Sequence, residues 1–171
     1  MKARNKPVEP LTRLAPPVSS DTSVVITPNY TQYAYVPAVD GLPEAYDGDT
    51  LRLDIDMGQH CWVRDLNYRL YGINAPEINR AATKRDATAS RDYLRTLIQT
   101  HQLRLPTPPG GGFWLVVRTH KQQRKRDYRP IAQQGKFGRY LVELFGKAVD
   151  GSWVNLNEKM LAAKHATVYV G

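Results

Sequence analysis

The segment YRLYGINAPE, residues 68–77, constrains the fold of this chain more than any other stretch. Its first four residues alternate in the manner of an extended strand, with Arg69 between an aromatic and an aliphatic side chain. Gly72 interrupts the pattern, and Pro76 has no N–H to give to a sheet ladder, so the strand must end before the proline. The segment therefore predicts a strand that leads into a turn.

The polar residues of this segment indicate a kind of chemistry. We expect Arg69 to lie on the strand, and Asn74 and Glu77 to lie just beyond its C-terminal end. A guanidinium suits a phosphate because its planar fork donates two parallel hydrogen bonds. Carboxylate and amide oxygens suit a hard cation. Together these side chains predict metal-assisted chemistry on a phosphodiester.

The composition favours an anionic partner. The 171-residue chain carries a formal net charge of +8, which makes nucleic acid the leading candidate, with a charge that serves only solubility as the alternative. Cys61 is the single cysteine, so an intrachain disulfide is excluded, and we expect this thiol to be buried or half-buried as a small apolar side chain. The scattered histidines do not have the spacing of a zinc site.

Hydrophobic periodicity predicts a mainly β chain of the α+β class. Leu51, Leu53 and Ile55 alternate with charged residues, which predicts a strand with one apolar face. About five strands and two helices favour a small closed barrel. In chain order we expect strands within 30–39, 51–55, 62–73, 103–105 resumed at 113–117, 135–145 and 167–170, and helices over 80–102 and from 155 onward.

Both expected helices have one apolar stripe. In the second, Asn155 followed by Glu158 resembles a capping box, and Lys164 stands where a helix-terminating glycine is expected, so we predict a strained or rearranged end. The residues expected on its stripe are Leu156, Met160 and Ala163. The residues expected on the buried stripe of the first helix are Ala87, Ser90, Leu94, Leu97 and Ile98.

Three motifs carry a resemblance to a known family. They are DGDT at residues 47–50, the segment from Arg69 to Glu77, and GKFGRY at residues 135–140. In this order and spacing, over roughly residues 45–170, they resemble the staphylococcal (micrococcal) nuclease, or thermonuclease, family. The resemblance implies a five-stranded OB-fold barrel with helices. It also implies a calcium-dependent endonuclease that hydrolyses DNA, and RNA as a further substrate, to leave 3′-phosphate ends.

The resemblance implies a site for one calcium ion, with Mg²⁺ or Mn²⁺ as alternatives. Asp49 matches a side-chain ligand, and Ala75 matches a residue whose backbone carbonyl ligates. Asn74 stands where the family has a ligating aspartate, and Asp47 matches an acidic neighbour of the ligands. An amide oxygen still suits calcium, but the site loses one formal charge, which predicts weaker metal binding.

The resemblance also implies catalytic and substrate-binding residues. Glu77 matches the carboxylate that positions or deprotonates the attacking water. Arg69 and Arg139 match the two arginines that clamp the phosphate, where preorganised donors stabilise the charge of the transition state. Lys136 and Phe137 match residues beside the nucleotide, with Phe137 able to stack on a base.

Composition and the resemblance together predict the domain organisation, and the targeting signals predict the location. Residues 1–28 hold five prolines and predict a disordered tail, and residues 29–171 are expected to form the nuclease-like OB-fold domain. We find no signal peptide and no apolar run of membrane-spanning length. The sequence therefore predicts a cytoplasmic protein that acts on nucleic acid and not on a membrane. A phage or plasmid origin and the oligomeric state stay open.

Two rival interpretations and one structural reading remain at this point. The first rival is a catalytically weak or inactive OB-fold module that binds nucleic acid without cutting it, which Asn74 favours. The second is a structural protein that contacts a protein partner. Individually, each motif also has a plain structural reading: 47–50 as a surface turn, and Arg69 as an ion-pair partner of Glu77.

Overall fold

The computed structural model describes residues 31–106, 111–120 and 140–169. The predicted tail and residues 29–30 lie outside these ranges, as do Lys136, Phe137 and Arg139. In chain order the elements are β1 (Thr31–Val39), β2 (Leu42–Pro43), β3 (Thr50–Gly58), β4 (Cys61–Leu70), β5 (Ile73–Asn74), a 3-10 turn (Ala81–Thr83), α1 (Lys84–His101), β6 (Gly112–His120), β7 (Tyr140–Lys147), β8 (Trp153–Asn155), α2 (Leu156–Ala162) and β9 (Thr167–Val168).

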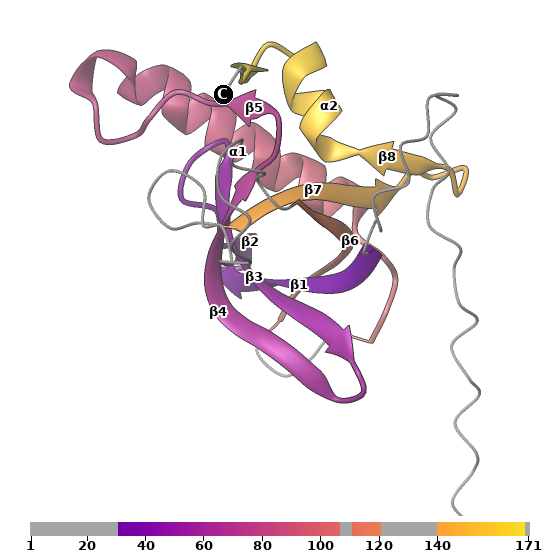
Figure 1. Ribbon diagram of the computed structural model, residues 1–171. Coiled ribbons are helices and arrows are strands. Elements are labelled where there is room, and N and C mark those ends of the chain that lie inside the picture. Colours follow the sequence, from indigo (N-terminus) through magenta and orange to yellow (C-terminus); the bar gives the residue numbers. More distant parts are fainter. Residues whose placement is uncertain (1–30, 107–110, 121–139, 170–171) are drawn as a thin grey trace, which may run out of the picture.

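Five strands close into a barrel. The antiparallel pairs are β1–β3, β3–β4, β7–β6 and β6–β1, and the parallel pair β4–β7 completes the circle. Helices α1 and α2 lie at one end of the barrel together with β5, and the β3–β4 hairpin extends away from that end (Figure 1). The predicted five-stranded barrel with two helices is confirmed, and its class is an OB-fold-like α+β arrangement.

Two tight turns set the register of the first four strands. Between β3 and β4 the turn residues are Gln59 and His60, both with positive φ, at +51° and +61°. Between β1 and β2 they are Asp40 and Gly41, with φ of +51° and +75°. Two positive φ values in a two-residue loop match the twist of antiparallel strands. The segment after residue 39 is therefore a hairpin turn.

The core forms between the apolar faces of the barrel strands and the apolar stripe of α1. Leu51, Leu53 and Ile55 of β3 point into the barrel, as their alternation predicts. The five residues predicted on the buried stripe of α1 are all buried, and those with aliphatic side chains longer than alanine join the barrel interior in one apolar cluster. Truncating one such side chain, for example Leu94→Ala, typically costs about 2–5 kcal/mol.

Helix α2 is held at both ends by hydrogen bonds. The Asn155 side chain accepts from the backbone N–H of Glu158 and of Asn157, which satisfies the predicted cap. At the other end Lys164 takes φ of +59°, and the N–H of His165 donates to the Met160 carbonyl. This is a Schellman arrangement with lysine where glycine is preferred, so of the two predicted outcomes the structure shows a strained end and not a rearranged one.

Several sequence predictions were wrong in detail. Ala163 is exposed, and the α2 residues that are buried are Leu156, Asn157 and Met160. Cys61 is exposed at the start of β4. Of the strand expected at 103–105, Leu103 makes a single bridge to β6. Among the described residues, no helix combines the length and apolarity needed to cross a bilayer.

Candidate functional site

The 47–50 turn lies against the end of β4 because of strand pairing. Thr50 opens β3 and is the cross-strand partner of Arg69, which is near the end of β4. The Asp49 carbonyl accepts a hydrogen bond from the Leu70 N–H at 2.8 Å. The register of one antiparallel pair therefore brings a carboxylate and a guanidinium together from residues twenty positions apart.

Asp49 is the centre of the cluster. Its carboxylate is 2% exposed, and its Oδ2 atom lies 2.9 Å from Arg69 Nη2 and accepts from the Ala75 N–H at 2.9 Å. The second oxygen, Oδ1, accepts from the Thr50 hydroxyl at 3.0 Å. A buried carboxylate is stable only when it is paired in this way. The contacts hold the Asp49 carboxylate in one orientation.

Arg69 joins Asp49 to Asn74. Its Nη2 atom donates to the Asn74 side-chain oxygen at 2.7 Å, so the same nitrogen serves both neighbours. The Arg69 side chain is 18% exposed and lies over the ring of Tyr169, 5.6 Å from its centroid. The structure therefore brings Arg69 and Asn74 together, as the 68–77 segment predicts, and adds Asp49, as the resemblance implies.

Asp47 adds a second carboxylate beside the first. It is buried, and its Oδ1 atom accepts from the Asp49 N–H at 3.2 Å. Burial and the neighbouring charge of Asp49 raise the pKa of Asp47 to about 6. Asp49 is paired with Arg69, and Asp47 adds a second buried carboxylate next to it, so the cluster holds more acidic groups than basic ones.

Asn74 and Ala75 are positioned by the C-terminal strand. Ile73 and Asn74 form β5, which pairs with β9, and the Asn74 carbonyl accepts from the Thr167 hydroxyl at 3.2 Å. The sequence predicts the strand near 167–170 but not its partner. Strand β9 thus forms one support of the turn that carries Asn74.

Glu77 lies apart from this cluster. Its side chain is 59% exposed, and its Oε2 atom pairs with Arg80 Nε at 3.0 Å. The Glu77 carbonyl accepts from the Thr83 hydroxyl at 2.9 Å in the turn before α1. Within the described chain the Arg69 guanidinium pairs with Asp49 and the Glu77 carboxylate with Arg80, so the plain reading of an Arg69–Glu77 ion pair is wrong.

Close packing against α1 fixes the turn from behind. A Cβ atom on Gly48 would come within 1.8 Å of Ser90 Oγ and 2.9 Å of Ala75 Cβ. The Ser90 hydroxyl in turn donates to the His165 carbonyl at 2.7 Å. A residue larger than glycine at 48 would push the turn away from the helix. The sequence indicates the buried position of Ser90 but not this contact.

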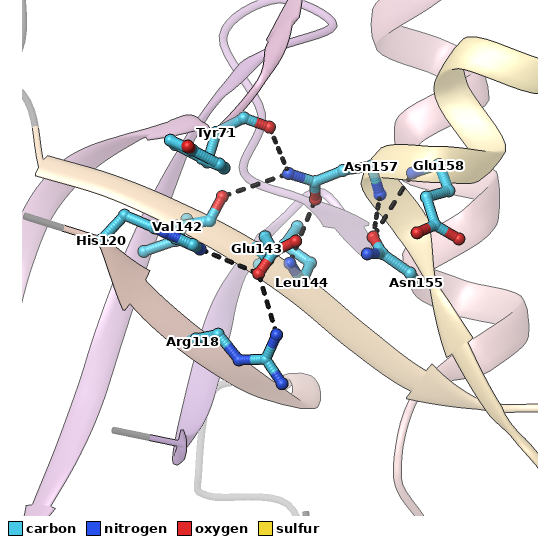
Figure 2. A network of polar contacts seen from close by, with 9 residues as sticks. All are labelled: Tyr71, Arg118, His120, Val142, Glu143, Leu144, Asn155, Asn157 and Glu158. Carbon is cyan, nitrogen blue, oxygen red and sulfur yellow. Dashed lines mark hydrogen bonds and ion pairs between the residues drawn. The ribbon is translucent and has the colours of Figure 1, made fainter. Parts of the chain in front are cut away.

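A second polar network, shown in Figure 2, was missed by sequence reasoning. The buried Asn157 donates from Nδ2 to the carbonyls of Tyr71 and Val142, at 3.0 and 3.2 Å, and accepts from the Leu144 N–H at 3.1 Å. One amide therefore links α2 to the residue that follows β4 and to two residues of β7. An asparagine two residues after a cap asparagine was the only available signal.

The oxygen donors of the cluster fit a hard divalent cation. Asp49 offers a carboxylate, Asn74 an amide oxygen that has a second lone pair beside the one used by Arg69, and Ala75 a backbone carbonyl. In the described part of the chain no three His, Cys, Asp or Glu residues gather as a metal site. A cation here would therefore depend on the amide and carbonyl oxygens.

Comparisons with known proteins leave the family open. A scan against models of protein families gave no match, and a search among curated proteins also gave none. The resemblance to the staphylococcal nuclease family therefore stays a prediction. The roles of Arg139, Lys136 and Phe137 also stay predictions, because these residues lie outside the described ranges.

Proposed function

We propose that the protein is a metal-dependent nuclease that hydrolyses phosphodiester bonds of DNA, and of RNA as a further substrate, and leaves 3′-phosphate ends. The observation that carries the proposal is the contact of Asp49, Arg69 and Asn74 at one mouth of the barrel. A carboxylate and an amide, which suit a hard cation, are in contact there with a guanidinium, which suits a phosphate. The net charge of +8 supports a nucleic-acid substrate.

The cation side of the site would be held by the chain's oxygens. Asp49 supplies the charged ligand, and Asn74 and Ala75 supply neutral ones, with Asp47 behind them. Bound calcium would polarise the phosphate and neutralise charge that develops on it. Because Arg69 Nη2 contacts both Asp49 Oδ2 and the Asn74 oxygen, a cation would displace it from these atoms and so free the guanidinium for the phosphate.

The chain's own groups would perform the remaining steps. Arg69 would donate hydrogen bonds to the phosphate and follow its charge into the transition state, with Arg139 as a second donor. Glu77 would accept the proton of the attacking water at a carboxylate oxygen. Freeing Glu77 from Arg80 would cost less than about 1 kcal/mol, because the pair is exposed. Arginine does not lose its proton in proteins, so water would protonate the leaving 5′-oxygen.

A cleavage assay tests this proposal. The full chain is incubated with single-stranded DNA, duplex DNA and RNA in calcium, in magnesium and in chelator. We expect calcium-dependent cleavage that leaves 3′-phosphate ends and is lost in Glu77→Gln. Glu158→Gln, which changes another exposed glutamate, is the matched control and should retain activity. Cleavage that survives chelator, or that Glu77→Gln retains, would contradict the assignment.

One alternative has support of its own. Asn74 lacks the charge of a ligating aspartate, and the Glu77 carboxylate is engaged by Arg80. Both observations favour an OB-fold module that binds nucleic acid without cutting it. That module would bind DNA in a salt-sensitive manner in the presence of chelator, with no product in any metal.

A further inference from the structure

A stacked pair of rings lies on the outside of the barrel. Tyr71, just after β4, stacks on His120 at the end of β6, with ring centroids 3.9 Å apart and planes 2° from parallel. Tyr71 is nonetheless 45% exposed. Since one face of its ring covers the imidazole, the exposed area must come from its edges and its other face. The pair presents an open aromatic surface.

The His120 ring of the pair is held by Glu143. Figure 2 shows His120 Nε2 2.8 Å from Glu143 Oε2, with Arg118 Nη1 3.4 Å from the same oxygen. Burial alone would raise the pKa of Glu143, but the hydrogen bond and charge of His120 and the charge of Arg118 outweigh it and lower that pKa. The carboxylate of Glu143 therefore holds both the His120 ring and the Arg118 guanidinium in place.

The backbone of Tyr71 is fixed as well. Its N–H donates to the Val142 carbonyl at 2.8 Å, and its own carbonyl accepts from the Asn157 side chain at 3.0 Å. Both backbone groups of Tyr71 are thus bound on the side of β7 and α2. A ring on such a support loses little freedom when a ligand stacks on it, which lowers the entropic cost of binding.

Strand register places the pair beside the candidate site. Arg69 of β4 is the partner of Leu141 in β7, and Leu141 is the partner of His120 in β6, so the three lie in one row across the sheet. With strands about 4.8 Å apart, the backbones of Arg69 and His120 are about 10 Å apart. Tyr71 follows Arg69 by two residues, on the side opposite the buried Leu70.

We propose that the Tyr71–His120 pair is a stacking platform for a nucleobase of the strand whose phosphate Arg69 would bind. Aromatic faces accept any base, so the platform would raise affinity for single strands without selecting a sequence. The guanidinium of Arg118, which pairs with Glu143, offsets the charge of this carboxylate toward the phosphate backbone. This inference rests on the proposed function, since it assumes a nucleic-acid ligand.

Binding measured by fluorescence anisotropy in chelator, where metal-dependent cutting is blocked, tests the platform. The full chain is titrated with a labelled single-stranded DNA and with an abasic oligomer of equal length. We expect Tyr71→Ala to weaken binding of the base-bearing strand at least about five-fold and Tyr71→Phe to preserve it. Binding of the abasic oligomer should not change. Thermal unfolding of each variant checks that the barrel remains folded.

Salt dependence separates stacking from charge. Tyr71→Ala removes no charge, so the slope of log affinity against log salt should stay that of the unsubstituted protein while the affinity falls. An equal loss for the base-bearing and abasic oligomers would overturn the platform, and so would an unchanged affinity or a complete lack of binding at low salt. Because cleavage plays no part here, base-dependent loss without nuclease activity would support the platform and reject only the proposed nuclease.

Discussion

The candidate site has two parts that differ in how the barrel holds them. The buried part consists of Asp47, Asp49 and Arg69, in which the Asp49 carboxylate is 2% exposed and has three donors. The exposed part is the pair of Glu77 and Arg80, with side chains 59% and 71% exposed. Strand register fixes the first, whereas a surface turn carries the second.

Because of this difference, substitutions that destabilise the fold can be distinguished from substitutions that affect function alone. Removing one partner of a buried ion pair leaves a charge without compensation and is strongly destabilising, whereas exposed pairs contribute about 0–1 kcal/mol. Substitutions in the buried part should therefore change both folding and function. Substitutions in the exposed part should change function alone. Four predictions test this contrast.

The largest expected effect is on stability. Asp49→Ala should lower the free energy of unfolding by about 3 kcal/mol, because Arg69 and the Ala75 N–H lose their partner. We place the loss at the low end of the range that is typical when a buried ion pair loses one partner. Arg69 keeps some contact with water, and Asp47 is relieved of a like charge. Urea unfolding at pH 7 measures it. A loss under about 1 kcal/mol would mean that the buried Asp49–Arg69 pair contributes no more to stability than an exposed ion pair.

The second prediction concerns pH. The pKa of Asp47 is about 6 in the folded protein and 3.8 when unperturbed, so between these values the unfolded chain binds fewer protons than the folded one. Stability should therefore fall as pH rises through this window and then level off. Asp47→Asn removes this titration. The free energy of unfolding of the variant, measured in urea, should therefore rise relative to that of the unsubstituted protein between pH 4 and pH 7. A gain independent of pH would contradict the raised pKa.

The third prediction addresses Asn74, whose side-chain oxygen contacts the buried part through Arg69. Asn74→Asp should strengthen calcium binding about ten-fold, because a unit charge beside a divalent ion contributes a kcal/mol or more. The readout is the calcium-dependent rise in melting temperature, which does not need activity. Gln59→Glu adds the same charge at the tip of the β3–β4 hairpin and is the control. An equal response in both variants would reject Asn74 as a ligand.

The smallest expected effect belongs to the exposed part. Glu77→Gln and Arg80→Ala should each change the free energy of unfolding by less than about 0.5 kcal/mol, because their ion pair is solvated. The same urea titration used for Asp49→Ala measures both. If either variant lost more than about 1.5 kcal/mol, the two parts would not differ in the way described here.

Periodicity predicted the parts of the fold that depend on local chemistry. The alternation of Leu51, Leu53 and Ile55 and the stripe of α1 report burial directly, so the barrel strand and helix face were correct. Element boundaries were less accurate. The helix expected from Arg80 begins at Lys84, since Arg80 is extended with φ of −99° and ψ of 119°.

Errors arose where long-range contacts decide the outcome. The strand expected over 62–73 divides after Leu70, because Gly72 takes φ of +75° and the chain turns toward β9. On α2 the sequence predicts a buried Ala163, but the structure buries Asn157. The Asn157 amide hydrogen-bonds three backbone groups that lie far away in the sequence. No local pattern encodes such a contact.

The candidate site shows the same division. The resemblance implied that Asp49, Arg69 and Asn74 would share one site, and the structure places them in contact. The engagement of Glu77 by Arg80 depends on the conformation of a surface turn, so a motif does not predict it. Their chemical roles stay predictions that the cleavage and calcium measurements test.

The pairing of β5 with β9 has a consequence for the timing of biosynthesis. A ribosome delivers the chain from its N-terminus, so Asn74 emerges 93 residues before the Thr167 hydroxyl that binds its carbonyl. During translation the barrel strands up to β4 can pair while Asn74 still lacks this support. If the proposed function is right, a nascent chain or a product truncated before Thr167 would lack an assembled cation site. Nuclease activity would then arise only after translation had passed β9, which would spare the messenger RNA from the protein that it encodes.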